Sequence, residues 1–172
     1  TGEDPNWPTD IRWSPDSTRI AYGGLFDATA KIWDVSTGEK LLSMRHSGYI
    51  SNIAFSADGK RLATTIEGDR VTIWNATTGQ LERTLQGHDR RVNSVAWSPD
   101  GKRLITGAKD GLAKIWNVEH DASILPHNEH VAHNLAWSPD DRLIAYQSDD
   151  KTVEICDASN GERVAGLERH DS

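Results

Sequence analysis

Short apolar runs that end at an aromatic residue recur along the chain, and each is followed by a polar turn. The pattern is clearest where the runs Val92–Trp97 and Leu104–Gly107 are joined by Ser98-Pro99-Asp100-Gly101. A third run, Leu112–Trp116, follows the turn Lys109-Asp110-Gly111. Proline presets φ, and Gly or Asp tolerates the left-handed region, so these polar segments suit tight reversals. Runs this short, with turn signals every ~8–12 residues, predict an all-β protein.

The same pattern returns about every 40 residues, which is typical of a repeat protein. An aromatic residue followed by Ser, Pro or Ala, and Asp begins at Trp13, Phe55, Trp97 and Trp137. A second motif, Ile with Trp or Cys and then Asp or Asn, begins at Ile32, Ile73, Ile115 and Ile155. Two independent motifs in one register indicate four copies of one structural unit.

Each unit is predicted to form four short strands, with the Ile-Trp motif on the third. The first strands are expected at residues 9–13, 50–55, 92–97 and 132–137. The fourth strands are expected at residues 40–44, 80–85, about 122–125 and 163–167. The units are expected to cover residues 7–45, 46–87, 88–127 and 128–170, within a single region of residues 1–172.

The repeat resembles that of the WD40 family over nearly all of residues 9–170. The likeness is closest in the third unit, which has Gly87-His88, the Ser-Pro-Asp-Gly turn and Ile115-Trp116-Asn117. The resemblance implies a β-propeller, in which each repeat forms one four-stranded antiparallel blade. The TolB-like propeller family also uses Trp-Ser-Pro-Asp-Gly, but the Gly-His and Ile-Trp-Asp features favour WD40. Both families imply the same all-β propeller fold.

The resemblance also implies a hydrogen-bonded tetrad inside each blade. At the matching positions the third unit has His88, Thr106, Asp110 and Trp116. A buried indole N–H and a buried imidazole need partners, which a hydroxyl and a carboxylate supply. A histidine beside an aspartate and a hydroxyl also resembles a nucleophilic triad. Because the spacing matches the blade network, the four residues are predicted to be structural.

The other units lack members of this set. The first has Tyr22 at the threonine position, and the second has Gly68 at the aspartate position. The fourth has Tyr146 for threonine and Cys156 for tryptophan, so its blade is expected to be less rigid or differently packed. Cys156 is expected to be a small buried hydrophobe rather than a reactive thiol.

Four blades leave two blade faces bare, since family propellers usually have more blades and stacked repeats need a neighbour. The chain is therefore expected to be part of a larger propeller or to be completed by self-association. Two copies would give an eight-bladed, two-fold ring. Further blades in a longer chain are the favoured interpretation.

Composition limits the partners and the location. A net charge of −7 argues against nucleic acid or an anionic membrane as the main ligand. The single cysteine makes no internal disulfide, and no apolar stretch approaches a membrane span, so a cytoplasmic location is expected. The histidines at residues 127–133 have a spacing that suits no familiar zinc site, so neither metal nor cofactor is expected.

Function in the WD40 family lies on the loops of the blades. Trp7, Tyr49, Arg91 and Val131 each lie six residues before the aromatic of their unit, and are expected to form one arc near the channel rim. Phe26, Arg70 and Lys109 are expected on the same face. Trp, Tyr and Arg are the residue types that dominate binding energy at interfaces. The alternative for Trp7 is that it covers an open edge.

The predicted function is a non-catalytic scaffold that presents these loops to a protein or peptide partner, as in the sensor region of a larger signalling protein. One alternative is a propeller enzyme with a hydrolase or metal site near the channel. The positions expected to line the channel are polar but poorly suited to chemistry: Thr9, Ser51, Asn93 and His133. The other alternative is a half-propeller whose function is self-assembly.

Overall fold

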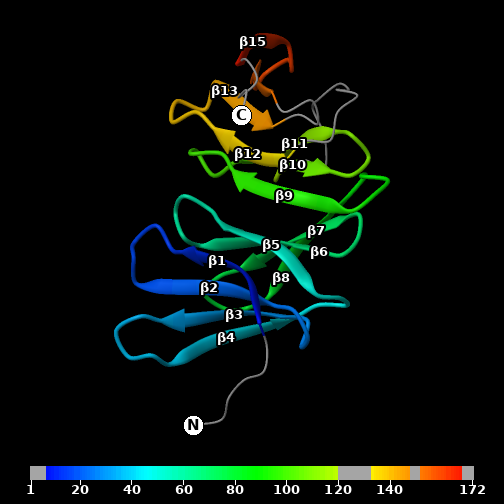
Figure 1. The fold of residues 1–172 in the computed structure, drawn as a ribbon. Helices are drawn as coiled ribbons and strands as arrows, with labels where there is room; N and C mark the ends of the chain where they lie inside the picture. Colours follow the sequence, from blue (N-terminus) through cyan, green and yellow to red (C-terminus); the bar gives the residue numbers. More distant parts are fainter. Residues whose placement is uncertain (1–6, 120–132, 148–151, 168–172) are drawn as a thin grey trace, which may run out of the picture.

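The computed structural model describes residues 7–119, 133–147 and 152–167. Within these residues the strands form four antiparallel sheets, and neighbours in each sheet are neighbours in the sequence (Figure 1). We call the sheets blades 1 to 4. The prediction of an all-β fold made of propeller blades is confirmed.

The strand bounds follow the repeat. Blade 1 contains β1 (Pro8–Trp13), β2 (Arg19–Gly24), β3 (Thr29–Asp34) and β4 (Lys40–Arg45). Blade 2 contains β5 (Ile50–Phe55), β6 (Arg61–Ile66), β7 (Arg70–Asn75) and β8 (Leu81–Gln86). Blade 3 contains β9 (Val92–Trp97), β10 (Arg103–Ala108) and β11 (Ala113–Asn117). Blade 4 contains β12 (His133–Trp137), β13 (Leu143–Gln147), β14 (Val153–Asp157) and β15 (Arg163–Leu167). The strand expected near residues 122–125 lies outside the described residues.

The turn between the first two strands of each blade explains the Ser-Pro-Asp motif. In blade 3 the Ser98 hydroxyl donates to the Asp100 carboxylate at 2.6 Å and accepts the Arg103 main-chain N–H at 2.9 Å. The serine–aspartate bond has the same length in the other three blades. The next residue has positive φ, 69° at Gly101 and 62° at Asp141. Glycine adopts this conformation without strain, so the motif ends best in Gly.

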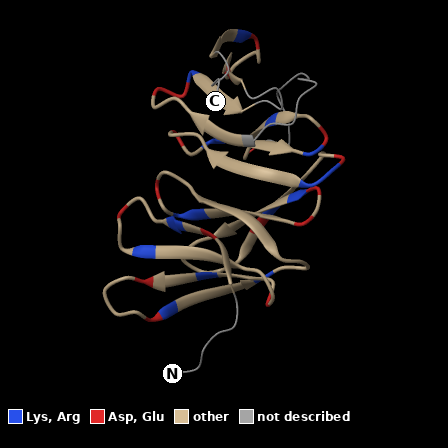
Figure 2. Ribbon diagram, in the orientation of Figure 1, with Lys and Arg blue, Asp and Glu red and all other residues tan. Residues whose placement is uncertain are grey.

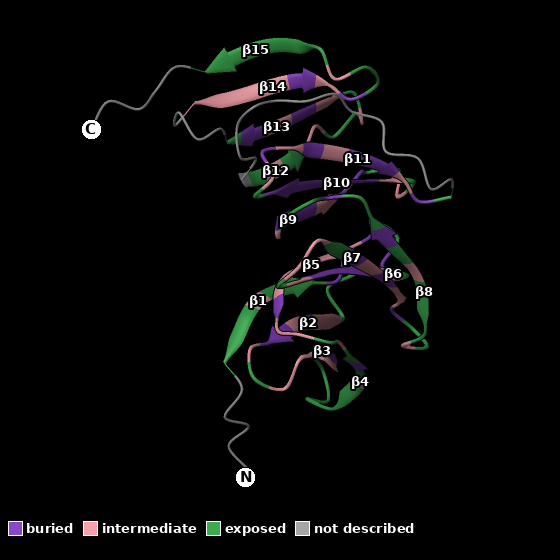
Figure 3. Cartoon of the chain, turned by 90° about the vertical axis from the view of Figure 1, so that its right-hand side faces the viewer, coloured by how far each residue is buried: buried purple, intermediate pink, exposed green. Residues whose placement is uncertain are grey.

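The hydrophobic core lies between the blades rather than within them. The first strands β1, β5, β9 and β12 pack side by side in that order (Figure 1). Each of three buried clusters combines side chains from two neighbouring blades: Ile32 with Ile53, Ile73 with Trp97, and Ile115 with Ile144. Burial is therefore greatest in the middle of the stack, as Figure 3 shows.

Blades 1 and 4 stand at the two ends of the stack (Figure 1), so the four blades form a partial propeller. Ile11 and Trp13 on blade 1 are 52% and 56% exposed. At the equivalent positions of blade 3, Val95 and Trp97 are buried against blade 2. Each end blade thus has one face that no other described blade covers.

An arginine at the start of the second strand fastens one blade to the next. The Arg103 guanidinium donates to the main-chain oxygens of Ala158 at 3.3 Å and Asp141 at 2.8 Å, both in blade 4. It also lies 4.7 Å from the ring centroid of Trp137. Arg19 makes the equivalent pair of hydrogen bonds from blade 1 to blade 2. These hydrogen bonds join the guanidinium of one blade to main-chain carbonyl oxygens of the next blade.

Arg61, at the same position of blade 2, behaves differently. Its Nε donates to the Glu82 carboxylate of its own blade at 3.0 Å. Among the described residues, Arg61 makes no hydrogen bond to blade 3. The joint between blades 2 and 3 therefore lacks the arginine contact; it is held by apolar packing and by the Trp97 indole, which donates to Ala54 O at 3.1 Å.

This difference leads to a stability prediction. Arg103→Gln should lower the free energy of unfolding by about 1–3 kcal/mol, because two charge-assisted hydrogen bonds and the ring contact are lost. Arg61→Gln is the matched control and should cost less than about 1 kcal/mol, since its partner Glu82 is partly exposed. Urea unfolding followed by tryptophan fluorescence measures both. Equal effects of the two substitutions would contradict the assignment.

Candidate functional site

Four side chains of blade 3 form one continuous hydrogen-bonded network. The Trp116 indole N–H donates to Thr106 Oγ1 at 2.8 Å, and Thr106 Oγ1 lies 2.7 Å from His88 Nε2. His88 Nδ1 lies 2.7 Å from Asp110 Oδ2. A carboxylate only accepts, so Nδ1 carries the imidazole proton and Nε2 accepts the threonine hydroxyl. The network ties the segment before β9 to β10, to the following turn and to β11.

The charges of this network are fixed by burial and by its hydrogen bonds. Burial lowers the pKa of His88, and the bond to Asp110 offsets this only in part. Burial alone raises the pKa of Asp110, but hydrogen bonds from His88 and from the Leu112 and Asp89 main chain hold it below its ordinary value. A neutral imidazole therefore faces an ionised carboxylate. Thr106 is fully buried, so its hydroxyl is not accessible to a substrate.

Blade 2 keeps most of the network without the aspartate. His46 Nε2 lies 2.7 Å from Thr64 Oγ1, and the Trp74 indole donates to the same oxygen at 3.1 Å. With Gly68 at the aspartate position, His46 Nδ1 donates instead to the Met44 main-chain oxygen at 2.9 Å. In both blades the histidine Nε2 is bonded to a threonine hydroxyl, and only the acceptor of the Nδ1 proton differs, Met44 O in blade 2 and Asp110 Oδ2 in blade 3.

Blade 1 replaces the network with a buried cation. Tyr22 stands at the threonine position and stacks on Trp33, whose indole nitrogen is buried without a hydrogen-bond partner among the described residues. Lys31 Nζ lies 2.8 Å from Asp27 Oδ2 and 5.7 Å from the Tyr22 ring centroid. Sequence reasoning missed Lys31, although a lysine two residues before the Trp of the motif was a visible signal.

Blade 4 has a tyrosine, a glutamate and a cysteine in place of the tetrad. The Tyr146 hydroxyl donates to Glu154 Oε2 at 2.7 Å and lies 3.8 Å from Cys156 Sγ. Burial raises the pKa of both the Tyr146 phenol and the Cys156 thiol. Cys156 is thus a buried, protonated thiol, and blade 4 is differently packed.

The loop residues predicted to bind a partner lie at one end of the blades. In three blades, the residue just before the first strand accepts a main-chain hydrogen bond from the residue just after the second strand. The pairs are Trp7 with Leu25 (3.2 Å), Tyr49 with Glu67 (3.2 Å) and Arg91 with Lys109 (2.8 Å). Three members of the expected arc therefore share one position. Val131, its fourth member, lies outside the described residues.

Tyr49, Glu67 and Arg91 form a compact group across blades 2 and 3, which we call the rim cluster. The Arg91 guanidinium lies 5.4 Å from the Tyr49 ring centroid, and its Nη1 is 3.8 Å from Glu67 Oε1. Arg91 Nε is buried and has no acceptor among the described residues. Burial and the neighbouring Glu67 raise the pKa of Tyr49, so the phenol stays protonated. The cluster thus presents an aromatic ring and an incompletely paired guanidinium.

The other candidate residues surround this cluster or lie on blade 1. Trp7 and Phe26 are 73% and 72% exposed. Arg70 is exposed and 3.8 Å from Asp69, and Lys109 is exposed next to the rim cluster. Figure 2 shows basic and acidic residues interspersed over the described blades rather than gathered by sign. The face therefore offers aromatic and mixed-charge contacts.

Comparison with family models places the chain. The model described as "WD domain, G-beta repeat" matches residues 2–34, 38–75 and 79–117. The chain belongs to the WD40 family. Residues 114–172 of this WD40 protein also match the "Anaphase-promoting complex subunit 4 WD40 domain" model.

Relatives of this WD40 chain share short segments of it. Protein HIR1 of Cryptococcus neoformans var. neoformans serotype D is 36% identical over 77 residues, 44% of this chain and 9% of the relative. A coronin-like protein of Saccharomyces cerevisiae is 28% identical over 38% of this chain and 10% of the relative. Anaphase-promoting complex subunit cdh1 of Dictyostelium discoideum is 33% identical over 47% of this chain and 11% of the relative. The matched segments span about a tenth of these relatives.

The same fold occurs in a crystal structure of the mitotic checkpoint complex. One of its chains aligns with 99% of this WD40 chain and 53% of its own length, with a TM-score of 0.89 and 22% identity. This likeness establishes the fold.

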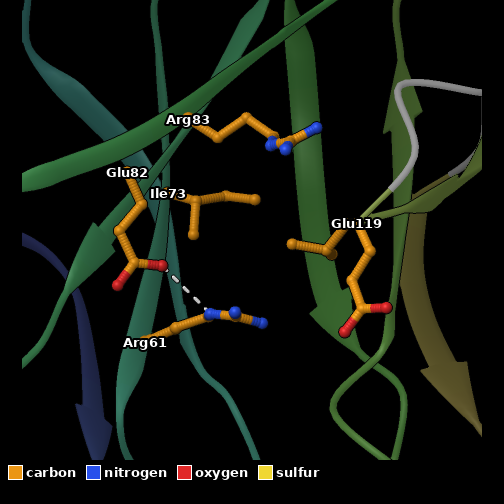
Figure 4. Close-up of a pocket in the computed structure, with 6 residues that line it drawn as sticks. Arg61, Ile73, Glu82, Arg83 and Glu119 are labelled. Atoms are coloured by element: carbon orange, nitrogen blue, oxygen red, sulfur yellow. Dashed lines mark hydrogen bonds and ion pairs between the residues drawn. The ribbon is translucent and has the colours of Figure 1, made fainter.

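A polar pocket of about 310 Å³ lies where WD40 blades 2 and 3 meet, and the ion pair of Arg61 with Glu82 lines it (Figure 4). Its lining residues are Arg61, Ile73, Glu82, Arg83, Val118 and Glu119. Two guanidinium and two carboxylate groups balance in charge, and the lining contains no nucleophile paired with a base. In the described part of the chain, no group of three or more His, Cys, Asp or Glu is arranged to hold a metal. No described helix has the length and hydropathy needed to cross a bilayer.

The tetrad leads to a second stability prediction. Thr106→Val should lower the free energy of unfolding by about 2–4 kcal/mol, because the Trp116 indole and His88 Nε2 both lose their partner inside the core. Thr84→Val, on the exposed side of β8, is the control and should change stability by less than about 0.5 kcal/mol. Chemical denaturation gives both values, and a neutral Thr106→Val would disprove the structural role.

The lowered pKa of His88 predicts how stability changes with pH. Below the unfolded-state value of about 6.5, the unfolded chain binds a proton at this position more readily than the folded chain. The stability contributed by neutral His88 is therefore complete above that pH and is lost as the pH falls below it toward the lowered folded-state pKa of His88. The free energy of unfolding should fall less over this range in His88→Gln than in the unmodified chain. Parallel pH dependences would show that His88 is not the titrating group.

Proposed function

We propose that this WD40 chain is a non-catalytic scaffold whose loop face binds a protein or peptide partner. The observation that carries the proposal is the rim cluster, where Arg91 and Tyr49 stand next to each other on a rigid support. Tyr and Arg are enriched among the few residues that carry most of the binding energy at known interfaces. The tetrad of blade 3 lies directly beneath, because Asp110 follows Lys109 and His88 precedes Arg91 by three residues. Anchors held this firmly lose little conformational entropy on binding.

The rim cluster also indicates the chemistry of the partner. The Arg91 side chain is 32% exposed, and Glu67 lies too far from Arg91 Nη1 for a hydrogen bond. A carboxylate or main-chain oxygen of the partner would complete the guanidinium, while Tyr49 offers an apolar ring and a hydroxyl. We therefore propose a peptide segment that carries an acidic residue beside an apolar one. Trp7, Phe26, Arg70 and Lys109 would extend the contact.

An enzyme is the less favoured function. Two of the positions expected to line the channel already have hydrogen-bond partners. Thr9 Oγ1 donates to Ile50 O of blade 2 at 2.6 Å, and Ser51 Oγ lies 2.8 Å from Thr65 Oγ1 within blade 2. Asn93 carries no acid–base chemistry. The tetrad resembles a triad in composition only, since its threonine is buried. These observations support a binding role over catalysis.

Location and partner identity are also proposals. We propose that the chain acts in the cytoplasm as the interaction region of a larger protein, with further WD40 blades beside it. The relatives offer candidate assemblies, because two comparisons name the anaphase-promoting complex. This likeness selects proteins of that complex as the first candidates for a binding test.

Binding by the rim cluster is testable once a partner is captured with the full-length protein. Tyr49→Ala with Arg91→Ala should weaken binding by at least about 100-fold, since each residue is placed as an anchor. The matched control is Arg83→Ala, which lies in the side pocket away from the rim. Titration calorimetry measures the affinities, and thermal unfolding verifies the fold. Unchanged affinity of the double variant would refute the proposal.

A further inference from the structure

At two joints between blades, an arginine of one blade spans a pair of main-chain oxygens of the next. Arg19 donates to Ala76 O through Nη1 at 2.8 Å and to Gly59 O through Nη2 at 2.7 Å. Arg103 makes the same two-pronged contact with blade 4. We call the two oxygens at such a joint the carbonyl pair. Each pair is thus an acceptor site for one planar guanidinium.

The joint between blades 2 and 3 has the same carbonyl pair, formed by Gly101 O and Val118 O. Gly101 has a φ of 69°, against 68° at Gly59, and in both turns the glycine N–H donates to the main-chain oxygen of the serine. The Val118 N–H donates to the main-chain oxygen of the residue after the glycine at 3.0 Å, as the Ala76 N–H does at 2.7 Å. The main chain therefore holds the two oxygens alike at both joints.

No described residue donates a hydrogen bond to this carbonyl pair. The surroundings of the two glycines show the difference. A Cβ built on Gly59 would lie 3.2 Å from Arg19 Nη2, whereas one built on Gly101 would have only its chain neighbours within 4 Å. The space that a guanidinium occupies beside Gly59 is therefore available beside Gly101.

Glu82 explains why Arg61 does not span this pair. Strand pairing places Glu82 of β8 at the position that Leu41 has in β4. Leu41 offers Arg19 no acceptor, whereas the Glu82 carboxylate accepts the Arg61 Nε proton at 3.0 Å. Because Arg61 is held within its own blade, the carbonyl pair can accept another donor.

The pocket between blades 2 and 3 supplies a carboxylate beside this pair. Val118 and Glu119 line the pocket together with Arg61, Glu82 and Arg83. Figure 4 shows the Glu119 carboxylate across the pocket from Glu82. Glu82 already pairs with Arg61, but the exposed Glu119 carboxylate has no hydrogen bond or ion pair among the described residues. An acceptor of full negative charge thus stands next to two main-chain oxygens.

We propose that this pocket binds an arginine side chain from a peptide segment of a partner protein. Its guanidinium spans Gly101 O and Val118 O, and Glu119 balances the charge. A planar fork matches two fixed acceptors, whereas the lysine ammonium is a point charge. Trp97 supplies the ring that Phe55 supplies to Arg19, which lies 5.7 Å from its centroid.

This site is separate from the rim cluster. Strand β9 runs from Arg91 at the rim to the turn that contains Gly101, so the pocket lies at the opposite end of the blades. The inference therefore goes beyond loop-face binding, and either proposal stands if the other fails.

Ligand-observed NMR titration of the full-length protein tests the site, with N-acetyl-arginine methylamide as the probe and its lysine counterpart for comparison. The arginine probe should bind saturably and about tenfold more tightly than the lysine probe. Glu119→Gln should raise the dissociation constant of the arginine probe about threefold or more, because a charge beside the guanidinium is lost. Glu39→Gln removes an exposed carboxylate of blade 1 and should change nothing.

Two further variants test the carbonyl pair itself. Glu82→Leu introduces the leucine of blade 1 and releases Arg61, which should then span Gly101 O and Val118 O and weaken probe binding about tenfold or more. Adding Arg61→Gln should restore binding, a rescue that damage to the fold would not produce, and thermal unfolding verifies each fold. Absence of saturable binding, equal binding of the two probes, unchanged affinity in Glu82→Leu, or no rescue in the double variant would overturn the proposal.

Discussion

The burial of one blade against the next is the interaction on which the rest of this structure depends. A four-stranded sheet has two faces, and in this chain both are apolar where another blade is adjacent. No single blade holds its own core, because Ile53, Ile73 and Ile115 each belong to a cluster shared with a neighbour. The turns, the arginines and the tetrad add to this packing by setting how each blade is oriented. The apolar contact between blades supplies the main stabilisation.

The tetrad converts this packing into a rigid support for the loops. In blade 3, His88 and Asp110 link two loop segments to Thr106 and Trp116 in the interior. The loops that carry Arg91 and Lys109 begin and end within a few residues of these anchors. Blades 1 and 4 use other chemistry, an ion pair around Lys31 and a phenol–carboxylate pair at Tyr146. The same backbone is therefore kept by three different polar solutions.

Much of the fold was predictable, because turn and strand signals are local. The strand predicted at residues 92–97 is β9 itself, and the period placed the other first strands within a residue or two. The tetrad was predictable only through its family spacing. The pairing of Lys31 with Asp27 and the diversion of Arg61 to Glu82 were not, because both depend on which of several nearby partners a long side chain reaches. The rim cluster was predictable in part. Its position followed from the repeat, but only the structure shows that Arg91 Nε has no acceptor among the described residues.

The shared clusters have a consequence for how the chain folds. Each sheet is a meander, so its main-chain hydrogen bonds join residues close in sequence and form without long loop closure. Apolar side chains become buried only when a second blade packs against the first, so an isolated blade buries too little apolar surface to remain folded. The smallest cooperative unit is then a pair of blades, as expected for a repeat array stabilised by nearest-neighbour contacts. Blades 2 and 3, each with a neighbour on both sides, are the natural nucleus from which ordering spreads to the two ends.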